Sequence, residues 1–188
     1  MNRLLFSNEI LYRKFVHPIH CLNAEIDGCG VFVDSLFLTV GHVGNQPFFV
    51  NHNGERINFS PEEAIFIHSE KPKQDTDYDI AVYPSKGVLS PIQFGDAPKL
   101  NTSLASYSYR HIGGEEECFK EIKSEGIVTE VVGNFFTCKM SKLLKGGSSG
   151  SPIFDRNCLI GLLVGCPNFE EDPKTILFIS SVSILSRL

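Results

Sequence analysis

Residues 146–154 have the sequence Gly-Gly-Ser-Ser-Gly-Ser-Pro-Ile-Phe, which changes abruptly from small polar residues to apolar ones. A glycine and serine run of this kind is typical of a flexible linker between domains. Here, however, apolar segments flank the run on both sides, and Pro152 leads directly into Ile153 and Phe154. Because buried flanking segments are rarely joined by disordered chain, we interpret the run as an ordered loop between strands.

The same loop matches, in part, a pattern that carries catalytic serines. Gly146, Ser148 and Gly150 form the Gly-x-Ser-x-Gly pattern of α/β-hydrolases, in which the catalytic histidine follows the serine along the chain. All six histidines of this chain precede residue 146. A subtilisin-like order needs an aspartate before the histidine on an α/β sheet, and helix signals here are few. Chain order and composition therefore exclude both α/β interpretations.

Outside this loop the chain has the spacing of short β-strands. Apolar, β-branched and aromatic runs separated by turn residues occur at 31–33, 36–40, 47–50, 64–68, 80–83, 104–109, 119–132, 135–140, 158–164 and 176–180. Helix signals are limited to residues 182–188 and 61–64. Within 104–111, the alternation of Tyr107, Ser108 and Tyr109 indicates a half-exposed surface strand. The pattern predicts an all-β barrel or sandwich.

The length and the distribution of proline predict how the strands are grouped. The 188 residues suffice for one compact domain made of two joined halves. Proline and glycine concentrate between Ser85 and Leu100, which indicates a linker. We therefore expect a single domain over 1–188, with an N-terminal half at about 20–85, a linker at about 86–100 and a C-terminal half at about 101–188.

Composition restricts the possible partners and the location of the chain. A net charge of −5 argues against nucleic acid or an anionic membrane as the main partner. No apolar run reaches the ~18 residues of a membrane helix, and the first ten residues do not form a secretory signal. We therefore expect a cytoplasmic protein whose six cysteines are reduced and mostly buried. His17, His20, Cys21 and Cys29 are zinc-ligand types without a standard spacing, so we expect ordinary packing and no metal.

Three separate segments carry a resemblance to one family. The loop Gly147-Ser148-Ser149-Gly150-Ser151-Pro152 resembles the Gly-x-Ser-Gly-[Ser/Gly]-Pro nucleophile loop of trypsin/chymotrypsin-like serine peptidases. Residues 28–43, with Gly-Cys-Gly-Val-Phe-Val and then Leu-Thr-Val-Gly-His, look like the family's strand pair that ends at the catalytic histidine. Residues 79–82, Asp-Ile-Ala-Val, are similar to its aspartate segment. The three segments follow the family's order along the chain.

The resemblance implies a fold and a reaction. It implies two antiparallel six-stranded-type β-barrels with the active site in the cleft between them. It further implies an endopeptidase acting on protein or peptide substrates without a cofactor, in which His42 is the general base, Asp79 orients it and Ser149 is the nucleophile. The N–H groups of Gly147 and Ser149 would form the oxyanion hole. Asp77 is the rival acid, but only Asp79 directly precedes the apolar strand.

The chain also departs from the secreted members of this family. Ser148 stands where they have the aspartate that pairs with a new N-terminus, and Val43 replaces the cysteine after the catalytic histidine. Zymogen activation is therefore not expected, and the pattern is closer to intracellular and bacterial-type members. Restraint of such a protease by a regulatory protein partner is one expectation. The alternatives are a catalytically silent homologue that binds peptides, and an esterase with the same triad.

Substrate preference depends on the expected pocket. By family position its floor lies at Leu143 and its wall along Val164, Gly165 and Cys166. Because such a pocket has no carboxylate to attract arginine or lysine, we expect cleavage after an apolar or uncharged residue. Lys145 is the feature that could instead favour an acidic residue.

Overall fold

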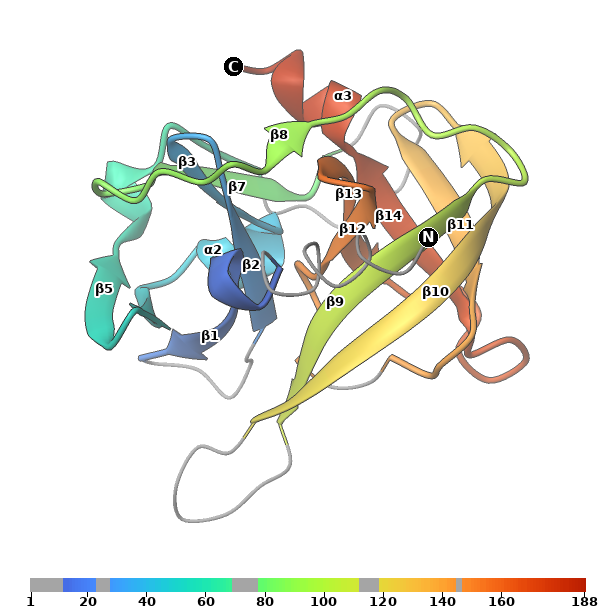
Figure 1. Ribbon diagram of the computed structural model, residues 1–188, viewed down its shortest axis with the longest axis horizontal. Coiled ribbons are helices and arrows are strands. Elements are labelled where there is room, and N and C mark those ends of the chain that lie inside the picture. The colour runs from blue at the N-terminus through green and yellow to red at the C-terminus, as the bar shows by residue number, and fades with distance from the viewer. Residues whose placement is uncertain (1–11, 23–27, 69–77, 112–118, 145–146) are drawn as a thin grey trace.

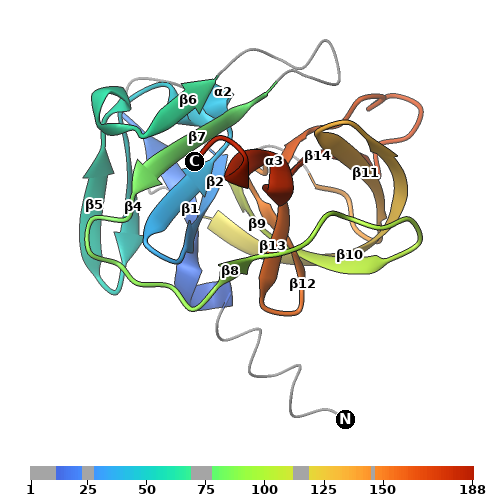
Figure 2. The ribbon, with the colours of Figure 1, turned by 90° about the horizontal axis from the view of Figure 1, so that it is seen from above.

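The computed structural model describes residues 12–22, 28–68, 78–111, 119–144 and 147–188. They form two β-sheets that lie side by side, one from each half of the chain (Figure 1, Figure 2). The all-β, two-barrel, trypsin-like fold class predicted from the sequence is confirmed, with one difference in how the N-terminal sheet closes.

The N-terminal sheet is curled and open. Its described strands run in the order β5-β4-β1-β2-β3-β7-β6. They are β1 (Val16–Cys21), β2 (Gly28–Val33), β3 (Leu36–Thr39), β4 (Phe48–His52), β5 (Glu55–Phe59), β6 (Phe66–His68) and β7 (Ile80–Pro84). A 3-10 turn, η1 (Pro61–Glu63), connects β5 to β6. Within the described residues β5 and β6 do not pair, so this half is a curled sheet where a closed barrel was expected.

The C-terminal sheet closes on itself. Its described strands are β8 (Gln93–Phe94), β9 (Ser103–His111), β10 (Phe119–Val132), β11 (Phe135–Met140), β12 (Pro152–Asp155), β13 (Cys158–Gly165) and β14 (Thr175–Ser180). Pairing of β12 with both β9 and β13 joins the ends of β12-β9-β10-β11-β14-β13 into a barrel. The short strand β8 adds to β13 in parallel, and the helix α3 (Ser181–Leu185) follows β14.

Phenylalanine fills much of the interior. In the N-terminal half, the rings of Phe37, Phe48 and Phe59 pack together with centroids 4.8 to 5.9 Å apart, and Phe59 stacks on both others. One buried cluster contains these rings together with Phe154 and Leu162 of the C-terminal half. Burial of this continuous apolar surface joins the two halves, because the hydrophobic effect scales with the area removed from water.

Several elements differ from the sequence-based expectation. The strands β1, β5, β8 and β12 were not predicted, and β8 lies in the segment that was expected to be a linker. Tyr107 and Ser108 were expected on a half-exposed surface strand, but both are buried, because β9 is covered on its two faces. No helix within the described part of the chain is long and apolar enough to span a membrane.

Candidate active site

His42 and Asp79 are brought together by the pairing of two strands. His42 lies on α2 (Gly41–Gly44), a single helical turn just after β3, and Asp79 directly precedes β7. Because β3 and β7 pair antiparallel, with Thr39 opposite Ala81, the end of one strand lies beside the start of the other. Phe37 and Leu38 of β3 and residues 80–83 of β7 are buried and fix this arrangement.

The Asp79 carboxylate holds His42 at two points. Its Oδ1 accepts the backbone N–H of His42 at 2.9 Å, and its Oδ2 lies 2.6 Å from His42 Nδ1. Since a carboxylate can only accept, Nδ1 carries the proton and Nε2 has the lone pair. Asp79 is fully buried, whereas the His42 side chain is 27% exposed. In the described part of the chain the imidazole hydrogen-bonds to Asp79 alone, so Nε2 is available as a base.

Ser149 lies in the loop between β11 and β12, and this loop packs against β2 close to the turn of His42. Its carbonyl oxygen accepts the N–H of Cys29 at 2.7 Å. A Cβ atom on Gly28 would lie 2.7 Å from Val43 and 2.9 Å from the Ser149 carbonyl oxygen, which shows how closely the loop approaches the His42 turn. No hydrogen bond joins the Ser149 hydroxyl to the imidazole among the described residues.

The loop needs a glycine at position 150. Gly150 has a φ of +84°, and its N–H donates to the Leu163 carbonyl at 2.8 Å. A Cβ atom there would lie 2.1 Å from the Cys29 carbonyl oxygen and 2.5 Å from Thr39 Oγ1. The loop can therefore contact β2 and β3 only without a side chain at this position.

Two backbone N–H groups remain available next to Ser149. Neither the Gly147 nor the Ser149 N–H donates a hydrogen bond to another described residue. Gly147 has a φ of +87°, which a residue with a side chain rarely adopts. Unpartnered N–H groups beside a serine hydroxyl can stabilise an oxyanion that forms there.

An apolar cavity of about 340 Å³ adjoins the loop. Besides the backbone of residues 147–149, it is lined by Leu144, Leu163, Gly165, Cys166, Phe169 and Ile176. None of the described residues that line it is charged. The cavity can accept an apolar side chain and provides no counter-ion for a charged one.

The structure differs in detail from the expected pocket. Gly165 and Cys166 line the cavity, but Leu144 contributes to it in place of its neighbour Leu143. Val164 lies between two lining residues on β13 and packs against the core cluster shared by the two halves. Successive side chains of a strand point to opposite faces, which explains why Val164 does not line the cavity. Asp77 and Lys145 lie outside the described residues.

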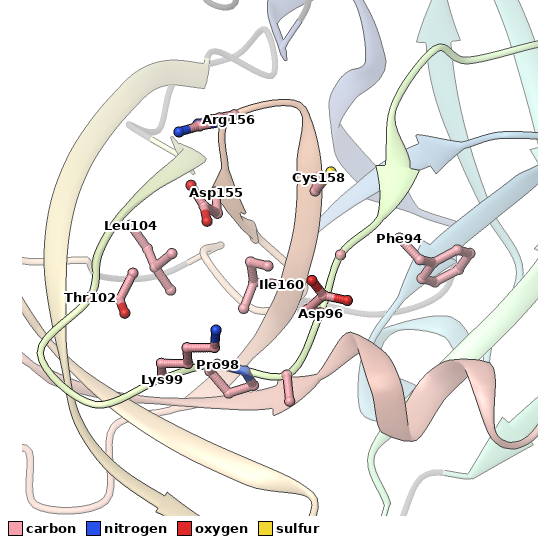
Figure 3. Close-up of a pocket in the computed structure, with 12 residues that line it drawn as sticks. Phe94, Asp96, Pro98, Lys99, Thr102, Leu104, Asp155, Arg156, Cys158 and Ile160 are labelled. Carbon is pink, nitrogen blue, oxygen red and sulfur yellow. The ribbon is translucent and has the colours of Figure 1, made fainter.

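A second cavity, of about 310 Å³, is lined by a different set of residues, which Figure 3 shows. It is bounded by the segment that connects the halves and by β13, with Leu104 and Ile160 in its floor. Asp96, Lys99 and Asp155 lie around it. None of the candidate catalytic residues lines it, so the apolar cavity beside Ser149 is the candidate substrate pocket.

The residues considered as zinc ligands are placed apart. His17 Nε2 lies 3.0 Å from His52 Nδ1, and Cys29 contacts the loop of Ser149. Among the described residues, no three His, Cys, Asp or Glu side chains are grouped so as to hold a metal ion.

Comparisons with known proteins identify the fold. No protein-family model matches the sequence, and no curated protein matches it. The active form of the Rv3671c protease from M. tuberculosis matches with a TM-score of 0.69 and 16% identity, over 100% of this chain and 83% of that chain. HL collagenase matches with a TM-score of 0.72 and 16% identity, over 92% of this chain and 90% of that chain.

A third similar structure has lost its activity. The scabies mite inactivated protease paralogue S-D1 matches with a TM-score of 0.70 and 9% identity, over 94% of this chain and 91% of that chain. The chain thus has the fold of trypsin/chymotrypsin-like serine proteases. Since active and inactivated proteins share this fold, function has to be inferred from the site itself.

Proposed function

We propose that this protein is a serine endopeptidase that acts through an acyl-enzyme on Ser149. The observation that carries the proposal is the double contact of Asp79 with His42, together with the available N–H groups of Gly147 and Ser149 in a loop that approaches the turn of His42. This set contains a nucleophile, a base, a group that orients the base and a place for the oxyanion. Such a combination is what acyl transfer requires.

The reaction follows from the roles of these atoms. Ser149 Oγ attacks the carbonyl carbon of the substrate while His42 Nε2 takes the hydroxyl proton. The N–H groups of Gly147 and Ser149 stabilise the oxyanion, and Asp79 stabilises the imidazolium. When the tetrahedral intermediate collapses, the C–N bond breaks and the amine leaves with the proton from Nε2. Water then hydrolyses the acyl-enzyme by the same route.

The apolar cavity supports cleavage after a large apolar residue. Leu144, Leu163 and Ile176 surround it, and its volume of about 340 Å³ can accept a branched or aromatic side chain. Burying a charged side chain there without a partner would be unfavourable. Arginine, lysine, aspartate and glutamate are therefore expected to be poor at this position.

Labelling with a fluorophosphonate tests the nucleophile. Intact mass and peptide mapping should show one adduct, on Ser149, which disappears in Ser149→Ala and in heat-unfolded protein. His42→Ala should slow labelling by orders of magnitude, because the hydroxyl then has no base. A folded protein that is not labelled would support a silent peptide-binding homologue. Turnover of esters without turnover of any peptide would support an esterase.

A peptide library tests the pocket. Wild type should prefer Leu, Phe or Tyr before the scissile bond. Phe169→Asp places a carboxylate at the cavity and should shift the preference towards Lys and Arg. Ile127→Asp is the matched control, because Phe169 and Ile127 are both 51% exposed and Ile127 lies on β10, away from the cavity. A wild-type preference for a charged residue would contradict this assignment.

A further inference from the structure

Three buried serines form a chain of hydrogen bonds beneath the loop of Ser149. The Ser151 hydroxyl donates to Ser108 Oγ at 2.9 Å, and the Ser108 hydroxyl donates to Ser148 Oγ at 3.0 Å. None of the three is more than 5% exposed. Ser108 comes from β9, so it ties a neighbouring strand to Ser148, directly before Ser149, and to Ser151, two residues after it.

Cys29 reaches the same loop from the N-terminal sheet. Its thiol donates to the Gly147 carbonyl at 3.2 Å and accepts the Tyr109 N–H at 3.3 Å. Its backbone N–H donates to the Ser149 carbonyl at 2.7 Å. Cys29 therefore contacts the two residues whose N–H groups are available for an oxyanion.

Cys29 is itself fixed close to His42. Its carbonyl oxygen accepts a hydrogen bond of 2.7 Å from Thr39 Oγ1, and Thr39 is the last residue of β3, just before the turn of His42. One residue of β2 thus links the strand that leads to His42 with the loop of Ser149. Because these two parts come from different sheets, their relative position depends on contacts of this kind.

The cluster is suited to positioning rather than to chemistry. Cys29 is fully buried, and burial raises the pKa of its thiol, so the group remains a neutral donor. Polar side chains in an interior are unfavourable unless each finds a partner, and a satisfied network fixes one arrangement. An apolar filling would pack equally well but would not fix the orientation of the Gly147 peptide.

We propose that Cys29 and Ser108 are positioning residues that hold the N–H groups of Gly147 and Ser149 in the geometry of an oxyanion hole. The inference rests on the proposed function. In this inference a buried thiol and a buried serine support the nucleophile loop. The serine does so through Ser148, which stands where secreted trypsin-like peptidases have an aspartate.

Three variants test the inference kinetically. Cys29→Ala and Ser108→Ala should each lower kcat by about 10- to 100-fold with KM within about twofold, since small misplacements of catalytic groups have effects of this size. Cys29→Ser restores a donor at the same place and should recover most of the loss. The rate of fluorophosphonate labelling should follow kcat.

Ser106→Ala is the matched control. Ser106 lies two residues before Ser108 on β9 and on the same face, is fully buried, and donates to the Pro152 carbonyl at 2.9 Å. Its loss should lower the thermal unfolding midpoint as much as the loss of Ser108 does, with kcat unchanged. Equal kcat values for Ser106→Ala and Ser108→Ala would overturn the role of Ser108.

NMR signals of the backbone amides test this inference independently of the proposed function, because they report the position of the loop and not its activity. The ¹H–¹⁵N signals of Gly147 and Ser149 should move further in Cys29→Ala than in Ser106→Ala. If they do not, the inference fails, whatever the activity. If they do, and wild type is neither labelled nor active, the positioning of the loop is supported and the proposed function fails instead.

Discussion

Among single residues, Asp79 has the clearest predicted effect on the reaction. In Asp79→Asn an amide faces His42 Nδ1, and its N–H₂ favours the tautomer in which Nε2 carries the proton. The imidazole then cannot accept the Ser149 proton, and kcat should fall about 10⁴-fold. Steady-state peptide hydrolysis measures this. Asp155→Asn, an exposed carboxylate on β12, should keep the wild-type rate. A loss of less than tenfold in Asp79→Asn would contradict the assigned role.

A second residue-scale prediction concerns Gly150. Gly150 and Gly87 have similar positive φ angles of +84° and +93°, so alanine is strained by about 1–2 kcal/mol at either site. A Cβ on Gly87 meets nothing within 4 Å, whereas one on Gly150 would lie 2.1 Å from a carbonyl oxygen. Urea denaturation should show Gly150→Ala losing about 2 kcal/mol more than Gly87→Ala. Equal losses would show that the loop can move away from β2.

The residues that the sequence predicted and those it missed differ in where their partners lie. His42, Asp79 and Ser149 each sit in a short local pattern, so a motif is enough to select them as candidates. The pattern around Cys29 gives its side chain no role and Ser108 lies in no motif, because the partners of the two side chains lie 118 and 40 positions away in the chain. Only the folded arrangement of β2, β9 and the loop shows what they contact.

At the scale of elements, a histidine pair joins β1 to β4. Burial lowers the pKa of His17 to about 4, with His52 contributing further, and burial lowers the pKa of His52 as well. The charged neighbours of His52 are Lys14 and Glu55. Both histidines are therefore neutral in the folded protein. In the unfolded chain these histidines take up protons below pH ~6.5. The contribution of the neutral pair to the free energy of unfolding is therefore fully present above that pH and is lost as pH falls towards about 4.

The loss of unfolding free energy with falling pH can be measured against a variant. The lowered pKa of His17 alone corresponds to a loss of about 3 kcal/mol between pH 7 and pH 4. His17→Gln keeps a polar partner for His52 but cannot be protonated. The difference in unfolding free energy between wild type and His17→Gln, measured by urea denaturation, should therefore change in this window. The contribution of the carboxylates is common to both proteins and cancels. A difference that stays constant with pH would refute the prediction.

The strands differ in how well the sequence predicts them. The bounds of β10 and β11 were predicted to the residue, since both are runs rich in strand-forming residues and the turn residues Gly133 and Asn134 separate them. By contrast, β1 contains Pro18 and two histidines, which argue against a strand. At Pro18, β1 pairs with β2 on one side only, because its described pairing with β4 begins at His20. A proline, which has no N–H to donate, is tolerated where one side of the strand is unpaired. Closure of the sheets depends on such non-local pairing, so the strand pattern alone does not predict it; the family resemblance implied two closed barrels, and only the C-terminal sheet closes among the described residues.

In the molecule as a whole, each end of the described chain packs on the opposite half. The last residues follow α3 back to the N-terminal sheet (Figure 2), where the Arg187 guanidinium lies 4.1 Å from the ring centre of Tyr78. Tyr78 directly precedes Asp79. At the other end, Tyr12 stacks on Phe154 with ring centres 4.2 Å apart and donates a hydrogen bond to the Arg156 carbonyl. These crossings join the half that holds His42 to the half that holds Ser149.

Tyr12 therefore contributes to the stability of the whole molecule. It is only 4% exposed and also contacts Tyr107, with ring centres 4.5 Å apart. Tyr12→Ala should lower the free energy of unfolding by about 3–5 kcal/mol, because it removes a buried aromatic ring. Tyr12→Phe keeps the ring, loses one hydrogen bond and should lose about 1 kcal/mol.

Urea denaturation followed by far-UV circular dichroism measures these losses. Leu22→Ala is the control near the same end of the chain, because Leu22 is 49% exposed, and it should stay within about 0.5 kcal/mol of wild type. Since one core cluster spans both halves, wild type and all three variants should unfold in a single transition. Two transitions in Tyr12→Ala would contradict the single transition and would show that Tyr12 couples the two halves. A loss of unfolding free energy below about 1 kcal/mol in Tyr12→Ala would show that the packing of Tyr12 on Phe154 contributes little.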